Sequence, residues 1–177
     1  MQTRKATFDD IMKTTKLVEK HALKNLPIIG LTEPYLSYFY TDKYRNQVKG
    51  IFLNGNKTKN RDSDINFIVA DTSGDIVGFV SGGSSLDNYD YDGEIYTIFV
   101  LTEDKDFEIR NLLFKTIIDE LRKIECNSFH VEITIDDPNK DFYIYKGARF
   151  ITEIKNMTNP PYTTIDYGWS DINALEL

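Results

Sequence analysis

The stretch from residue 102 to 125 constrains the fold more than any other part of the chain. Apolar residues recur in it at every third or fourth position: Ile109, Leu113, Ile117, Leu121 and Ile124. This spacing places them on one face of a helix, and the charged residues between them face away. A helix with a single apolar face has to pack against another apolar surface, so the rest of the chain must supply a sheet or further helices.

The residues before this helix follow the period of two that is typical of β-strands. Residues 65–71 and 76–83 alternate in this way around a Ser-Gly-Asp turn, so they predict a β-hairpin. Residues 93–101 predict a third strand. Strict alternation would place four of its residues on one face: Glu94, Tyr96, Ile98 and Val100. Glu94 would then stand at the start of the strand beside an apolar face.

The residues after the helix return to the strand pattern. Residues 128–135 alternate strictly, and their polar face includes His130, which we expect to be exposed. Residues 138–147 predict a short helix with Pro138 in its first turn and Gly147 as its C-terminal stop. Two strands, separated by a turn at residues 159–161, close the chain.

The N-terminal third predicts a short strand followed by helices. Residues 2–6 alternate, and Thr7 can cap a helix in which Asp10 completes a carboxylate variant of the capping box. That helix should run to about Lys24, with His21 at the boundary of its apolar stripe. A second helix should begin near Thr32 and residues 42–53 predict a third, before a polar loop.

Together these elements predict one domain over residues 1–177, in the α+β class, with α/β-like three-layer packing and a mixed sheet. Apolar residues make up 41% of the chain, enough for a core. The formal charge of −7 should repel nucleic acid and anionic lipid and favour a cationic partner. No apolar run is long enough to cross a membrane, and a lone cysteine and two histidines argue against disulfides and metal sites. We therefore expect a cytoplasmic protein.

Three segments carry a resemblance to a known family. They are the strand at residues 93–101 with its helix, the FYxxxG pattern at Phe142, Tyr143 and Gly147, and the closing DYGW at residues 166–169. In this order they resemble the GNAT superfamily of N-acetyltransferases, in particular small bacterial members that acetylate polyamines or other small amines. The resemblance covers nearly the whole chain. It implies a twisted, mostly antiparallel sheet of six or seven strands with helices on both faces.

The resemblance also implies a cofactor and a reaction. The pantetheine arm of acetyl-CoA would lie between strands 93–101 and 128–135, with the pyrophosphate at the start of the following helix. The residues that the resemblance assigns to the cofactor are Ile98, Phe99, Val100, Lys105, Asp106, Phe107, Glu108, Ile109, Arg110, Asp137 and Lys140. Glu94 would remove a proton from the amine, and Tyr143 would donate one to the sulfur. Tyr35, Tyr38 and Tyr96 would line the site for the amine.

Each of these roles has an alternative. Glu94 could be a structural hydrogen-bond acceptor, Tyr143 a packed core tyrosine, and the aromatic residues near Tyr35 and Tyr38 ordinary core. His130 could act as the base in place of Glu94.

The phosphate-binding loop departs from the family pattern Q/R-x-x-G-x-G/A. Lys105 occupies its first position, and Glu108 and Arg110 replace the two glycines. Glycine lets the backbone approach a phosphate closely, whereas Glu108 adds a negative charge there. Asp137 replaces an asparagine that is usual in the family.

Three functions follow as alternatives. The first is an N-acetyltransferase for small amines with weakened affinity for acetyl-CoA. The second is a binding or regulatory module that keeps the fold without catalysis. The third is an interaction protein that forms a homodimer through the aromatic helix at residues 34–40 and an exposed strand edge.

Overall fold

The computed structural model describes residues 1–7, 9–10, 13–14, 66–72, 74–85, 90–100, 106–137, 139–157 and 161–175. The elements in these ranges are β1 (Gln2–Lys5), β2 (Asn66–Thr72), β3 (Asp75–Ser84), β4 (Gly93–Val100), α4 (Asp106–Lys123), β5 (Phe129–Thr134), α5 (Lys140–Tyr145), β6 (Arg149–Asn156), β7 (Tyr162–Trp169) and the 3-10 helix η1 (Ile172–Ala174). The helices predicted near Thr32 and at residues 42–53, and most of the first helix, lie outside the described residues.

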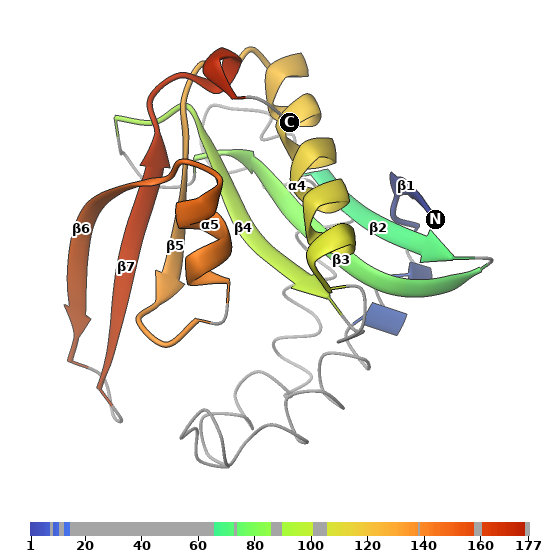
Figure 1. The fold of residues 1–177 in the computed structure, drawn as a ribbon, viewed down its shortest axis with the longest axis horizontal. Coiled ribbons are helices and arrows are strands. Elements are labelled where there is room, and N and C mark those ends of the chain that lie inside the picture. The colour runs from blue at the N-terminus through green and yellow to red at the C-terminus, as the bar shows by residue number, and fades with distance from the viewer. Residues whose placement is uncertain are drawn as a thin grey trace.

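The strands form a single sheet in the order β1-β2-β3-β4-β5-β7-β6 (Figure 1). Every neighbouring pair is antiparallel except β4 and β5, which are parallel. The predicted α+β class and the mixed, mostly antiparallel sheet are confirmed, with seven strands in the described part of the chain. Figure 1 shows α4 lying across β2, β3 and β4, with α5 over β5 and β7. The helices predicted for the opposite face fall within the undescribed N-terminal segment.

Helix α4 packs closely on the sheet because glycines of β3 leave room for its apolar stripe. The predicted stripe is confirmed, since Ile109, Leu113 and Ile117 are buried. A Cβ atom added at Gly78 would lie 3.1 Å from side-chain atoms of both Ile109 and Leu113. A Cβ added at Gly82 would lie 3.1 Å from Ile117. The helix and β3 are therefore fitted to each other at the level of single methyl groups.

Aromatic rings join α4 to α5 and to the other half of the sheet. Phe114 of α4 lies 5.6 Å from Phe142 of α5 and 5.7 Å from Trp169 of β7, measured between ring centroids. Phe129 of β5 stacks on Trp169 at 4.4 Å. The Trp169 indole donates a hydrogen bond to the Lys146 carbonyl, 2.8 Å away. This cluster ties α4 to β5 and β7 across the parallel junction of the sheet.

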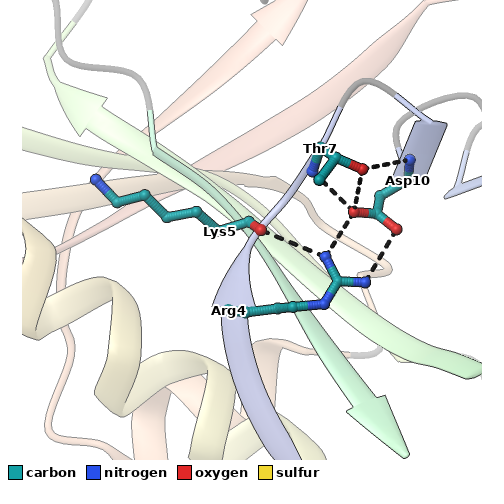
Figure 2. Close-up of polar contacts among 4 residues, drawn as sticks. All are labelled: Arg4, Lys5, Thr7 and Asp10. Carbon is teal, nitrogen blue, oxygen red and sulfur yellow. Dashed lines mark hydrogen bonds and ion pairs between the residues drawn. The ribbon is translucent and has the colours of Figure 1, made fainter. Parts of the chain in front are cut away.

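The predicted helix cap at Thr7 is present (Figure 2). The Asp10 amide donates to Thr7 Oγ1 at 3.4 Å, and the Thr7 amide donates to Asp10 Oδ2 at 2.7 Å, which is the reciprocal pattern of a capping box. Arg4 of β1 adds two hydrogen bonds to the same carboxylate, at 2.6 and 3.1 Å. The hydrogen bond from Arg4 holds the pKa of Asp10 well below its usual value, although burial opposes it. Asp10 thus ties β1 to the start of the first helix.

The predicted alternation along β4 is wrong beyond Ile95. Ser81 of β3 pairs with Thr97 and Gly82 pairs with Ile95, so Tyr96 is an extra residue in a β-bulge. The bulge turns the strand so that Ile95 and Ile98 both lie in the core. Glu94 and Ile98 therefore lie on opposite faces of the sheet. The predicted strand at residues 128–135 is also one residue too long at each end, because β5 begins at Phe129 and the exposed Ile135 lies in a turn.

We predict that Gly78→Ala lowers the free energy of unfolding by about 1–3 kcal/mol, because overpacking strains a filled core. The new Cβ would lie 2.8 Å from the Phe99 carbonyl oxygen. Gly74→Asn in the β2–β3 turn is the control. No atom lies within 4 Å of an added Cβ there, so this variant reports only the strain of a side chain at a φ of +96°. Urea unfolding measures both, and an equal loss in the two variants would contradict the close fit of α4 on β3.

We predict that Asp10→Asn lowers the free energy of unfolding by about 1–3 kcal/mol at neutral pH, because charge-assisted hydrogen bonds to Arg4 are lost. Asp9→Asn, an exposed neighbour in the same helical turn, is the control and should change it little. The lowered pKa means that the contribution of Asp10 is present above the ordinary value of 3.8 and is lost as the pH falls below it. The gap between wild type and Asp10→Asn should narrow in that range, and a constant gap would refute the assignment.

Candidate functional site

The two parallel strands at the centre of the sheet stay together for only two residue pairs. Gly93 pairs with Phe129 and Glu94 with His130, and the Gly93 amide donates to the Ser128 carbonyl at 3.0 Å. Beyond this point β4 remains paired with β3 through Val100, and β5 with β7 through Thr134. Figure 1 shows β4 and β5 diverging. Among the described residues, the β4–β5 ladder thus ends at Glu94 and His130, and an extended ligand can pair with the edge of a strand.

Glu94 and His130 lie side by side at the point of divergence. Glu94 Oε2 is 3.8 Å from His130 Nε2, and the Glu94 side chain is 14% exposed. His130 Nδ1 lies 2.9 Å from Asp166 Oδ1, and His130 Nε2 lies 3.2 Å from Ser85 Oγ. Strands β4, β5 and β7 and the residue that follows β3 therefore place polar side chains in one cluster. We call these residues (Ser85, Glu94, His130 and Asp166) the polar cluster.

The prediction that His130 is exposed is wrong, because only 1% of its surface is accessible. Alternation along β5 shows correctly that His130 faces away from α4, but it cannot show what covers that face. The missing signal was Asp166 in the DYGW segment. It lies two residues from Gly168, the residue that pairs with His130 on β7. A carboxylate on the adjacent strand lets a histidine be buried without losing its hydrogen bonds.

Tyr91 covers His130 from the loop that precedes β4. The two ring centroids are 5.8 Å apart. Gly168 makes this placement possible, because a Cβ atom there would lie 2.6 Å from the Tyr91 ring. Burial lowers the pKa of His130, but its hydrogen bond to Asp166 and the charges of Asp166, Glu94 and Glu132 outweigh burial and raise the pKa overall. His130 is therefore a stronger base than a free histidine.

Tyr143 lies in the core on the opposite face of the sheet. Only 1% of it is exposed, and its ring meets those of Phe142 and Trp169 at 5.7 and 6.2 Å. Burial and the charge of Asp137 raise the pKa of Tyr143, while Arg110 opposes them. Burial likewise raises the pKa of Asp137, whose carboxylate accepts a hydrogen bond from the Asn139 amide at 2.6 Å. The Tyr143 phenol is consequently protonated at neutral pH.

The first turn of α4 contains an ion pair between Asp106 and Arg110. Arg110 lies 2.5 Å from the Asp106 carboxylate and over the Phe142 ring, 5.5 Å from its centroid. The Arg110 Nε is buried without a hydrogen-bond partner among the described residues. Phe107 and Glu108 are exposed on the same turn. Both substitutions of the family's glycines thus contribute charge to this end of the helix.

The remaining predicted site residues divide into three groups. Ile98 and Ile109 are buried in the core, Val100 packs against it and Phe99 stacks on Phe79 on the other face. Tyr96 donates its hydroxyl to the Ser84 carbonyl at 2.7 Å, and Lys140 begins α5. Tyr35, Tyr38 and Lys105, as well as His21, lie outside the described residues.

Other features of the described residues add no further binding or metal-ligating group to this site. A cavity of about 430 Å³ next to Tyr145, Arg149 and Trp169 includes none of the predicted site residues. Within the described ranges, no group of three or more potential metal ligands is found. The helices in those ranges include none long and apolar enough to span a membrane.

Solved structures of acetyltransferases share this fold. A protein assigned to the GNAT family of acetyltransferases from Desulfovibrio desulfuricans superposes with a TM-score of 0.70 at 15% identity, covering 96% of this chain and 98% of that one. The ribosomal-protein-alanine N-acetyltransferase from Brucella melitensis gives 0.67 at 16% identity, covering 96% and 99%.

A third solved structure includes a ligand. It is the PaiA N-acetyltransferase from Thermoplasma acidophilum in complex with coenzyme A, with a TM-score of 0.64 at 15% identity, covering 95% of this chain and 98% of that one. No protein-family model and no curated protein sequence matches the chain. The likeness therefore lies in the fold, and the chemistry has to be argued from this chain's own residues.

Proposed function

We propose that this protein is an N-acetyltransferase that transfers the acetyl group of acetyl-CoA to a primary amine of a small molecule. The observation that carries the proposal is the divergence of β4 and β5 directly beyond Glu94. A carboxylate at the closed end of the divergence and a strand edge at which the β4–β5 ladder has ended are what acetyl transfer needs from a protein. The coenzyme A complex of the Thermoplasma protein supports the choice of co-substrate.

The backbone of β4 can hold and polarise the thioester. The amide-rich pantetheine arm can pair with the edge of β4 beyond Glu94, as an added strand would. An N–H group near residues 98–100 would then stabilise the negative charge that develops on the thioester oxygen. The Arg110 Nε, which is buried and has no hydrogen-bond partner among the described residues, is a further donor near the start of α4.

Two side chains would carry the protons. Glu94 removes a proton from the ammonium form of the substrate, because only the neutral amine has a lone pair for attack on the thioester carbon. Tyr143 gives its proton to the departing sulfur, and its raised pKa keeps the phenol protonated until that moment. Ammonium and acetyl-CoA thus become amide, free thiol and one proton.

The charge of the chain favours a cationic acceptor. Its formal charge is −7, and Glu94 and Asp166 add two carboxylates at the site. A small amine is an ammonium ion at neutral pH, so the field of the protein attracts it. Polyamines and related small amines are therefore the substrates we propose.

We predict that Glu94→Gln lowers kcat/KM by about 10²–10⁴-fold, the usual contribution of a general base. Release of the coenzyme A thiol, followed with a panel of polyamines and other small primary amines, measures it. Glu132→Gln is the matched control, since it removes the same charge from the next strand, and it should stay within about threefold of wild type. Equal rates for Glu94→Gln and wild type would rule out Glu94 as the base.

Binding of acetyl-CoA without thiol release from any amine would favour a non-catalytic binding module instead.

We predict that Glu108→Gln tightens acetyl-CoA binding by about two- to fivefold, because it removes the repulsion between this carboxylate and the phosphates, about 1 kcal/mol at 4 Å in water. Glu125→Gln, beyond the far end of α4, is the control and should leave the affinity unchanged. Isothermal titration calorimetry measures both. The gain should shrink as salt is added, since Glu108 is exposed. A weaker affinity in Glu108→Gln would show that this carboxylate does not face the phosphates.

A further inference from the structure

The polar cluster contains more proton-binding groups than the proposed reaction uses. Glu94 is the base of that reaction, but His130 and Asp166 behind it are each only 1% exposed and form a closely bonded pair. Resting on the proposed function, we propose that the His130–Asp166 pair receives the proton that Glu94 removes from the amine. His130 is then a relay that acts through Glu94, and Asp166 is the residue that positions it.

The sheet register brings Glu94 and His130 together. They are the last paired residues of β4 and β5, so their side chains lie on the same face of the sheet. The 3.8 Å between Glu94 Oε2 and His130 Nε2 exceeds a hydrogen bond by about 1 Å. A small rotation of the Glu94 side chain would close this distance. Because β4 and β5 diverge only beyond this pair, the relay stands behind the reacting atoms rather than among them.

Asp166 fixes which ring nitrogen is able to accept the proton. Its Oδ1 lies 2.9 Å from His130 Nδ1, and a carboxylate only accepts, so Nδ1 has to be the ring atom that bears hydrogen. The lone pair of neutral His130 is then on Nε2, the atom that faces Glu94 and Ser85. The other oxygen of Asp166 is buried and has no hydrogen-bond partner among the described residues. A buried carboxylate that accepts so few hydrogen bonds is stabilised when the neighbouring imidazole ring gains a proton and becomes a cation.

The charged groups around His130 also favour the protonated form of its ring. Asp166 faces it from β7, Glu94 from β4 and Glu132 from β5 itself, while Ser85 and the Tyr91 ring contact it from the segment between β3 and β4. These carboxylates outweigh the effect of burial and raise the pKa of His130. A free imidazole is already a stronger base than a free glutamate carboxylate, and the pKa of His130 is raised above that of a free imidazole.

The proton can be followed through each bond. An N–H bond of the ammonium breaks as an O–H bond forms on Glu94. That O–H bond then breaks as an N–H bond forms at His130 Nε2, which returns Glu94 to the carboxylate. Tyr143 separately loses its proton to the sulfur. The extra N–H proton that the nitrogen still carries after its attack is lost to water as the C–S bond breaks. Exchange with water then removes the proton from His130 and restores the one on Tyr143, so the enzyme is unchanged and one proton is released.

Two measurements on the same variants test the relay. The chain has only two histidines, so NMR can follow the His130 ring by comparing wild type with His130→Gln. In wild type, kcat/KM should rise with pH at the pKa at which His130 titrates. In Asp166→Asn both pKa values should fall together by about one unit or more, because the hydrogen-bonded charge is lost. In Glu132→Gln, which removes a charge but no hydrogen bond, both should fall by less.

His130→Gln should lower kcat by about 10–100-fold with KM little changed, because proton transfer and not binding is impaired. Thermal unfolding shows which variants fold. If Asp166→Asn does not fold, the results for His130→Gln and Glu132→Gln test the relay. A pH profile that stays in place while the His130 pKa moves, or a fully active His130→Gln, would overturn the relay and leave the proposed function intact. A wild type that acetylates none of the amines would overturn both.

Discussion

Hydrogen bonding between β4 and β5 stops after Glu94 and His130, and the architecture on both sides of the sheet follows from that break. A β-bulge at Tyr96 turns β4 within its pairing with β3, while β5 continues straight along β7. Two strands that diverge inside a sheet would leave the core open unless each is held from elsewhere. Here β3 and β4 are covered by α4, and β5 and β7 by the aromatic cluster around Trp169.

The same break separates two chemical environments. On the α4 face, Tyr143 is packed among aromatic rings that keep its phenol protonated. On the opposite face, carboxylates surround His130 and make it more basic. A site that has to remove a proton from one partner and donate one to the other benefits from this separation, because each group is tuned by neighbours that the other group does not share.

Much of the fold could be predicted from the sequence, because local patterns encode it. The stripe of α4, the Ser-Gly-Asp hairpin turn and the capping box at Thr7 depend on residues close to one another in the chain. The bulge at Tyr96 and the burial of His130 could not, because they depend on contacts with Gly82 and Asp166 on other strands. The candidate site was the hardest part to predict, because its polar cluster combines residues of β4, β5 and β7 with the residue after β3.

Hydrogen exchange along β4 tests the central claim most directly, because it reports whether the edge of β4 beyond Glu94 forms backbone hydrogen bonds with acetyl-CoA. Saturating acetyl-CoA should slow exchange of the amides within residues 96–100 and leave those of β6 unchanged. Unaltered exchange in β4 at millimolar acetyl-CoA would contradict the account. Protection confined to the cavity beside Tyr145, Arg149 and Trp169 would contradict it equally, since the ligand would then bind away from the divergence of β4 and β5.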